Sequence, residues 1–210
     1  MILASNSYWV NDTNPCLTYA LRGVLSAKVT VRMKEVRQAD IHSGWEGGAI
    51  VEPLADLVRI MGHLTSVQHG DEPFPGFYAD IAPMSQDEAA RLDRVAAAQQ
   101  LSGAPSEKPM TLLDLKNRWC RPAISIHSID AGATTGDHGV IPRSATCHFS
   151  VRTVPDQDAH GMKTALAQQI LRLFGEKSAQ ANTLHVRSLR SLLTFFRFFL
   201  PVAASSCYIC

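Results

Sequence analysis

The chain has 210 residues, of which 46% are hydrophobic and 19% are charged, with 20 basic and 19 acidic side chains. This length supports one well-formed core with extensions, and the composition is that of a globular protein rather than a disordered one. A net charge of +1 provides no electrostatic basis for binding nucleic acid or an anionic membrane surface. The five cysteines have no framework spacing and no signal peptide begins the chain, which favours free thiols and a cytoplasmic location.

The two ends of the chain differ from the segment between them. Residues 2–9 pass from an apolar run into a turn, as at the end of a buried strand. Residues 192–200 are almost wholly apolar, but the run is shorter than the about 20 residues that span a bilayer, and it contains Arg197. We interpret residues 189–210 as an apolar tail from altered coding sequence, with a hydrophobic interface or a membrane-surface segment as the alternative.

The first half of the chain predicts one strand and three helices. A strand is expected where apolar and polar residues alternate, with Ala27, Val29, Val31 and Met33 on one side. A helix follows Pro53, with an apolar stripe of Leu54, Leu57, Val58, Met61 and Leu64. Residues 71–83 are rich in Pro and Gly and predict a loop. A polar helix is expected from Ser85 to about Leu101, and a short one ends at Trp119 after a second loop.

The second half predicts three strands and one helix. One strand follows Pro122, with Ile124 and Ile126 on one side. After a turn at 132–139, the next strand places Cys147, Phe149 and Val151 inward and His148, Ser150 and Arg152 outward. A helix then carries the apolar stripe Met162, Leu166, Ile170, Leu173 and Phe174, and Gly175 ends it. Leu184 and Val186 indicate the last strand.

This order of elements, β-α-(insertion)-β-β-α-β, predicts an α+β fold of the ferredoxin-like, split βαβ type. We expect a four-stranded antiparallel sheet with two helices on one face, and a helical insertion at about residues 66–121. Because this fold supports many unrelated functions, the function must be read from motifs.

Seven short motifs occur in one order at plausible spacings. They are Ser-Asn-Ser-Tyr-Trp at 5–9, Pro-Cys-Leu-Thr-Tyr at 15–19, Leu-Arg-Gly at 21–23, Asp-Ile-His-Ser-Gly at 40–44, Gly-Gly at 47–48, Ile-Pro-Arg at 141–143, and Phe-Ser-Val-Arg at 149–152 before Val154 and Pro155. Together they resemble the family of co-catalytic zinc peptidases and deacylases that includes carnosine dipeptidases and cytosolic nonspecific dipeptidases. Within it, the chain is most similar to the dipeptidase-like subunit of the fungal glutathione-degradation complex.

The resemblance implies a division of the chain. Residues 17–188 correspond to the lid, or dimerisation, domain of the family, and residues 1–16 to a remnant of the zinc catalytic domain into which the lid is inserted. Family members bind two zinc ions in that catalytic domain, where zinc activates water and polarises the scissile carbonyl of a small peptide. The other ligand motifs are not in this chain, so we expect it to bind no zinc and to hydrolyse nothing alone.

One metal-ligand position of the family falls inside the chain. The family has Asp there, whereas this chain has Asn6, and a neutral amide is a poorer zinc ligand than a carboxylate. Either one metal site of the parent enzyme is weakened, or a partner subunit performs the chemistry, or Asn6 only caps a turn.

His42 is the main candidate for a catalytic role. The resemblance implies that it reaches into the active site of the partner subunit and donates a hydrogen bond to the developing oxyanion. The alternative is that Asp40 and His42 only bond the backbone of a tight loop. The neighbouring glycines, Gly44, Gly47 and Gly48, fit a loop that passes close to another backbone.

Arg152 is the candidate for substrate binding. The resemblance implies that its planar fork holds the free carboxylate of a dipeptide, while the alternative is an ion pair with an acid on the sheet surface. The family also has a substrate-binding Thr just before Ile-Pro-Arg, and Gly139 stands near that place here.

Three functions remain open. The first is the dimerisation portion of a dipeptidase-like zinc hydrolase, active in glutathione breakdown and acting through His42 across a homodimer. The second is a non-catalytic subunit of a heteromeric peptidase complex, which Asn6 favours. The third is an unrelated ferredoxin-like binding module.

Overall fold

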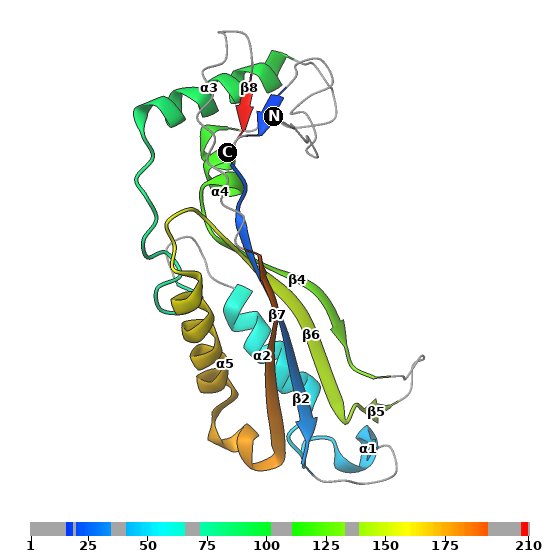
Figure 1. Cartoon of the computed structure of the whole chain (residues 1–210). Coiled ribbons are helices and arrows are strands. Elements are labelled where there is room, and N and C mark those ends of the chain that lie inside the picture. Colours follow the sequence, from blue (N-terminus) through cyan, green and yellow to red (C-terminus); the bar gives the residue numbers. More distant parts are fainter. Residues whose placement is uncertain are drawn as a thin grey trace.

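The computed structural model describes residues 16–18, 20–34, 41–65, 72–101, 111–132, 139–192 and 207–209. Its main body is one long antiparallel sheet of four strands (Figure 1). Across the sheet these are β4 (Ala123–Asp130), β6 (Ser144–Thr153), β2 (Gly23–Met33) and β7 (Asn182–Leu192). Helices α2 (Pro53–Thr65) and α5 (Ala159–Ala181) pack on the sheet's apolar face. The predicted ferredoxin-like α+β fold is confirmed.

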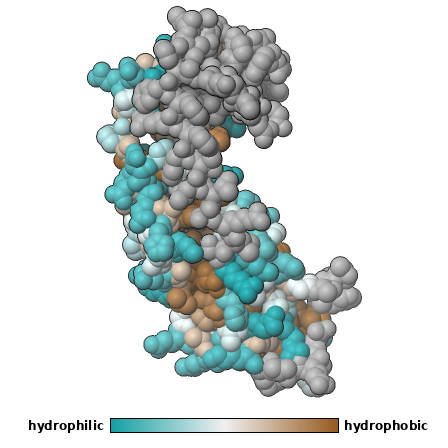
Figure 2. All heavy atoms as spheres, in the orientation of Figure 1, coloured by the Kyte–Doolittle hydropathy of each residue, from teal (hydrophilic) through white to brown (hydrophobic). Residues whose placement is uncertain are grey.

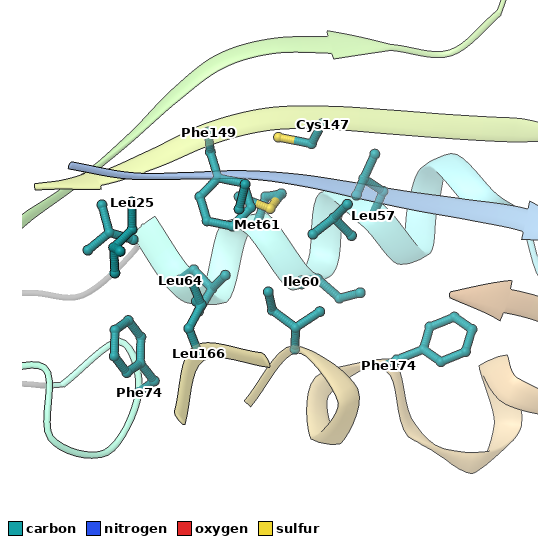
Figure 3. Packing of buried hydrophobic residues seen from close by; sticks show 14 of the residues in the cluster. Leu25, Leu57, Ile60, Met61, Leu64, Phe74, Cys147, Phe149, Leu166 and Phe174 are labelled. Carbon is teal, nitrogen blue, oxygen red and sulfur yellow. The ribbon is translucent and has the colours of Figure 1, made fainter. Parts of the chain in front are cut away.

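The main core lies between the sheet and these two helices (Figure 3). Alternate residues of the two central strands are buried: Leu25, Ala27, Val29, Val31, Cys147, Phe149 and Val151. The helices cover them with Leu57, Ile60, Met61, Leu64, Met162, Leu166, Ile170 and Phe174. Each large apolar side chain buried here contributes about 1.5–3 kcal/mol. The same burial raises the pKa of the Cys147 thiol, because the thiolate would lose its hydration.

The core differs from the sequence prediction in a few places. Val58, predicted on the apolar stripe of α2, is half exposed, and Ile60 is buried instead. Phe74 and Phe77 fold from the predicted loop into the main core. Gly175 was predicted to end α5, and its φ of 70° interrupts the helix there, but helical turns resume and continue to Ala181. A period of 3.6 residues places an apolar stripe only to within a residue or two, since neighbouring helices decide which side chains they cover.

A β-bulge at His127 alters the outer face of the sheet. The register of β4 against β6 shifts between Ile126 and Ser128, so His127 is the extra residue. The His127 imidazole turns onto β6, where Nε2 lies 2.9 Å from Ser150 Oγ. Ser150 was predicted to face outward, and it does lie on that face, but it is buried beneath this contact.

The helical insertion has its own small core. Helices α3 (Gln86–Leu101) and α4 (Leu112–Trp119) pack through Leu92, Val95, Ala96 and Leu115. Ser85 precedes α3 and Thr111 precedes α4, and each hydroxyl accepts a hydrogen bond from the backbone N–H of an acidic residue three positions later, Glu88 or Asp114. Among the described residues, no helix is long and apolar enough to cross a membrane. Hydrophilic residues cover most of the described surface in Figure 2, with a brown apolar strip along the middle of the body.

Two short strands, β1 (Cys16–Thr18) and β8 (Cys207–Ile209), pair in parallel near the insertion (Figure 1). Strand β7 continues to Leu192, so its last residues belong to the segment predicted as a tail. Asn6, most of the turn predicted at 132–139, and most of the predicted apolar tail lie outside the described residues.

A buried carboxylate joins α2 to the end of α5. Asp56 Oδ1 accepts hydrogen bonds from Ser178 Oγ at 2.7 Å and from Arg59 Nη2 at 3.0 Å. Its Oδ2 accepts one from Asn182 Nδ2 at 3.0 Å, and the same amide donates to the Val51 carbonyl. The network satisfies a buried charge and fixes the first turn of α2 against the junction of α5 and β7.

Replacing the carboxylate will therefore destabilise the fold. Asp56→Ala leaves the Ser178 hydroxyl and one N–H of the Asn182 amide without their acceptor, so we expect the free energy of unfolding to fall by about 2–4 kcal/mol. Urea unfolding followed by circular dichroism measures this change. The control Asp93→Ala removes an exposed acid from α3 and should change stability by less than about 0.5 kcal/mol; equal losses in both variants would contradict the assigned role of Asp56.

Candidate functional site

His42 lies at one end of the long sheet, on a small tip built from three segments (Figure 1). Strand β3 (Ile41–His42) pairs with β5 (Val140–Ile141), and helix α1 (Ser43–Glu46) follows at once. Ile41 and Ile141 are buried, and the Ser43 N–H donates to the Gly139 carbonyl at 2.6 Å. The backbone of the tip is thus fixed on both sides, while the His42 side chain is exposed.

A backbone hydrogen bond selects the tautomer of His42. The Gly44 N–H donates to His42 Nδ1 at 3.1 Å, which makes Nδ1 an acceptor. A neutral imidazole carries one proton, so the proton is assigned to Nε2. The alternative role of His42, a hydrogen bond to the backbone of its own loop, is therefore present in the structure. That bond uses only Nδ1 and leaves Nε2 as a hydrogen-bond donor. The two roles are compatible.

The glycines of the tip each meet a separate steric requirement. A Cβ on Gly47 would lie 2.3 Å from the Ser43 carbonyl oxygen, and a Cβ on Gly44 would lie 3.1 Å from the His42 ring. Gly48 has φ of +82°, a conformation that other residues adopt only with strain. The sequence predicted that these glycines let the loop pass close to another backbone, and the backbone that comes close is that of the loop itself, at Ser43.

Gly139 lies directly beside His42. A Cβ at this position would be 3.6 Å from His42 Nε2 and 3.0 Å from Ser43 Oγ. Gly139, which stands near the place where the resemblance implies a substrate-binding Thr, therefore adjoins the histidine in this structure. With glycine there, the space around Nε2 stays open on that side.

Arg152 lies at the opposite end of the sheet, near the end of β6, and is exposed. Its cross-strand neighbours are Val24 on β2 and Ala123 on β4, and neither is acidic. Among the described residues, no acidic side chain forms an ion pair with Arg152. The surface ion pair that we considered as an alternative has no partner in this part of the chain.

Arg22, which the sequence analysis did not single out, lies close to Arg152. Its Nη1 donates to the Arg121 carbonyl at 3.2 Å. Burial and then the like charge of Arg152 lower the pKa of the Arg22 guanidinium. Arg22 belongs to the Leu-Arg-Gly motif at 21–23, but that motif alone does not reveal its neighbour, because β2 and β6 are far apart in sequence.

The two predicted residues do not share one site within a single chain. Strand β6 has 10 residues, and at about 3.3 Å per residue it separates the two ends of the sheet by about 30 Å. A dipeptide spans only about 7 Å when extended. One small peptide therefore cannot contact His42 and Arg152 of the same chain.

The described residues do not fit a metal site. Across the parts of the chain that the structure describes, no group of three or more His, Cys, Asp or Glu side chains is arranged to hold a metal ion. A zinc ion has no set of ligands there, and no step of a reaction is derived from one.

Comparison with known families matches residues 19–177 to the peptidase dimerisation domain. The chain belongs to this family. The matched region covers three of the four sheet strands, β2, β6 and β4, together with α2 and α5 as far as residue 177, and β7 lies beyond it. The predicted assignment as a lid or dimerisation domain is confirmed.

The relatives of this dimerisation domain include fungal peptidases. The chain is 31% identical over 188 residues to the "Probable di- and tripeptidase DUG2" of Saccharomyces cerevisiae, covering 90% of the chain and 20% of the relative. It is 34% identical over 179 residues to the "Cys-Gly metallodipeptidase DUG1" of Candida albicans, covering 82% and 36%. The chain thus spans between about a fifth and two fifths of the length of these relatives.

Solved structures show the same fold. Human carnosine dipeptidase 1 matches with a TM-score of 0.78 and 23% identity, over 98% of this chain and 46% of that one. The dipeptidase Dug1p of Saccharomyces cerevisiae matches with a TM-score of 0.77 and 24% identity, again over 98% and 46%.

The tautomer of His42 can be tested through Gly44. In the native chain we expect the ¹⁵N shifts of neutral His42 to place its proton on Nε2. Gly44→Ala puts a Cβ against the ring and should displace it, so the share of the other tautomer should rise. Two-dimensional NMR of ¹⁵N-histidine-labelled protein measures this ratio.

Gly62→Ala is the matched control, because a Cβ at Gly62 meets nothing within 4 Å. It should leave the His42 signals unchanged. A native His42 protonated mainly on Nδ1 would contradict the assigned hydrogen bond.

Proposed function

We propose that this chain is the dimerisation portion of a dipeptidase-type zinc hydrolase, in which His42 acts in the active site of the partner subunit. The observation that carries the proposal is the separation of His42 from Arg152 by the length of the sheet. Since one peptide cannot reach both residues of one chain, each active site takes them from different subunits.

The path of the chain indicates which residue serves its own subunit. Val24, near the start of β2, pairs with Leu192, the last residue of β7, so the sheet is entered and left at the end that carries Arg152. A catalytic domain connected through both points would adjoin Arg152 and would be far from His42. Arg152 then acts in its own subunit, and His42 acts across the dimer.

The chemistry of His42 suits stabilisation of an oxyanion. Nε2 is the donor, the ring is fixed by the Gly44 N–H, and no side chain at position 139 covers it. A preorganised donor of this kind contributes about 3–4 kcal/mol to transition-state stabilisation. Zinc, held outside the described residues, would supply the activated water, as the metallodipeptidase relatives indicate.

The substrate is a small peptide with a free carboxylate, which Arg152 binds. The Cys-Gly metallodipeptidase relatives favour a role in glutathione breakdown, and cysteines without framework spacing favour the cytoplasm. The chain would pair with a second copy or with a related peptidase subunit.

A second function is a non-catalytic subunit of a peptidase complex. Asn6 favours it, because an amide at the family's ligand position weakens metal binding. Light scattering of the purified chain, alone and with a metallodipeptidase subunit, separates the two: the catalytic proposal predicts a homodimer, and this alternative predicts a mixed assembly.

Mixing two inactive variants tests the arrangement directly in the zinc enzyme that carries this domain. His42→Ala and Arg152→Ala should each lower activity strongly, by about 10²-fold for His42 in turnover. In a mixed dimer, one site combines Arg152 from the His42→Ala subunit with His42 from the Arg152→Ala subunit, so both residues are intact there. Random pairing after equimolar mixing should thus restore about a quarter of native activity.

The control is His185→Ala, which removes an exposed histidine from β7 and should leave activity unchanged. If both residues acted within one subunit, every site of the mixed dimer would lack one of them. A mixture no more active than its components would therefore refute the exchange of His42 between subunits.

A further inference from the structure

Arginines gather at the end of the sheet that carries Arg152. Arg152 pairs across the sheet with Val24 on one side and Ala123 on the other. Arg22 and Arg121 each stand two residues before one of these neighbours. Because side chains alternate along extended backbone, Arg22 shares the face of Arg152, opposite to the face that α2 and α5 cover, while Arg121 lies in the bend before β4.

Arg22 is held in a defined position beside Arg152. It is half-buried, and its Nη1 donates to the Arg121 carbonyl at 3.2 Å, which ties the segment before β2 to the segment before β4. The ionisable groups that act on Arg22 within the described residues are Arg152, Cys120 and Arg118, so no carboxylate is among them. Arg22 and Arg152 are thus diagonal neighbours on one face of the sheet, and their like charges repel each other unless an anion lies between them.

We propose that Arg22 is a second substrate-binding arginine, which holds the carboxylate of an anionic peptide together with Arg152. The inference deepens the proposed function and rests on it for the role of Arg152. A carboxylate offers about four acceptor positions, and one guanidinium fork uses only two of them. A second fork from Arg22 occupies the others.

The pair also explains how a free carboxylate is selected over an amide. A carboxylate between two guanidinium groups replaces one repulsion with two attractions, whereas a neutral amide leaves the repulsion in place. One arginine alone gives a smaller difference, because it has no repulsion to relieve. Arg22 is thus a specificity residue for peptides with a free carboxyl terminus.

NMR titration of the purified chain tests this with N-acetylglycine as the probe and N-acetylglycinamide as its neutral counterpart. N-acetylglycine should shift the side-chain Nε–Hε signals of both Arg22 and Arg152, and the amide should shift neither. Arg22→Gln should raise the Kd for N-acetylglycine about tenfold, because it removes a charged donor. Arg32→Gln, an exposed arginine near the other end of β2, should leave that Kd unchanged.

The outcomes separate this inference from the proposed function. If Arg152 shifts and Arg22→Gln binds like the native chain, the role of Arg22 is refuted while that of Arg152 stands. If neither arginine shifts, carboxylate binding at this end is refuted altogether, while the dimer measured by light scattering is unaffected. Chloride at equal ionic strength that produces the same shifts would show a general basic patch and also overturn the proposal.

Folding of the variant does not limit the test. Arg22→Gln is checked by its melting temperature, and Arg22→Lys replaces it if needed, since lysine keeps the charge but loses the fork. Arg22→Lys should retain part of the affinity and lose most of the preference for N-acetylglycine over its amide. Equal preference in Arg22→Lys and the native chain would contradict a bidentate contact.

Discussion

The alternation of apolar and polar side chains along β2 is the constraint on which the rest of the structure depends. This strand is hydrogen-bonded on both sides, to β6 and to β7, and it buries Leu25, Ala27, Val29 and Val31 on one face only. One apolar face requires one layer of helices, and α2 and α5 supply it. The opposite face is left without these helices, and it carries the two arginines that the proposals use.

The length of the sheet then decides how a site can be assembled. The tip with His42 and the end with Arg152 are separated by the whole of β6, and strands of hydrogen-bonded sheet do not shorten. No movement of side chains brings two such ends together on a dipeptide. Pairing of two copies is the arrangement that brings the ends of different chains together, and it agrees with membership of a dimerisation family. In this protein, dimerisation is therefore proposed as a part of the site and not only as a means of stability.

The sequence predicted the four sheet strands and the long helices from local signals, but it did not predict the short elements β1, β3, α1, β5 and β8. Alternation at 27–33, the stripe of α5 and the break at Gly175 all depend on neighbours in the chain. The sequence could not predict interactions between distant segments: the hydrogen bonds of Asp56 with Asn182 and of His127 with Ser150, and the placement of Arg22 on the face of Arg152. The motifs identified His42 and Arg152, but only the register of the strands shows that they lie at opposite ends. Asn6 stays a prediction, since it falls outside the described residues.

Gly139 shows why this separation matters for specificity. A side chain at that position would contact His42, so a Thr there would add a hydroxyl next to the proposed oxyanion donor. With glycine at position 139, no side chain occupies this space beside Nε2. Recognition of the carboxylate is unaffected in our proposal, because it depends on Arg22 and Arg152 at the far end of the sheet. In this proposal, the tip would be free to vary with the acyl group of the substrate, while the arginine end would keep the requirement for a free carboxyl terminus.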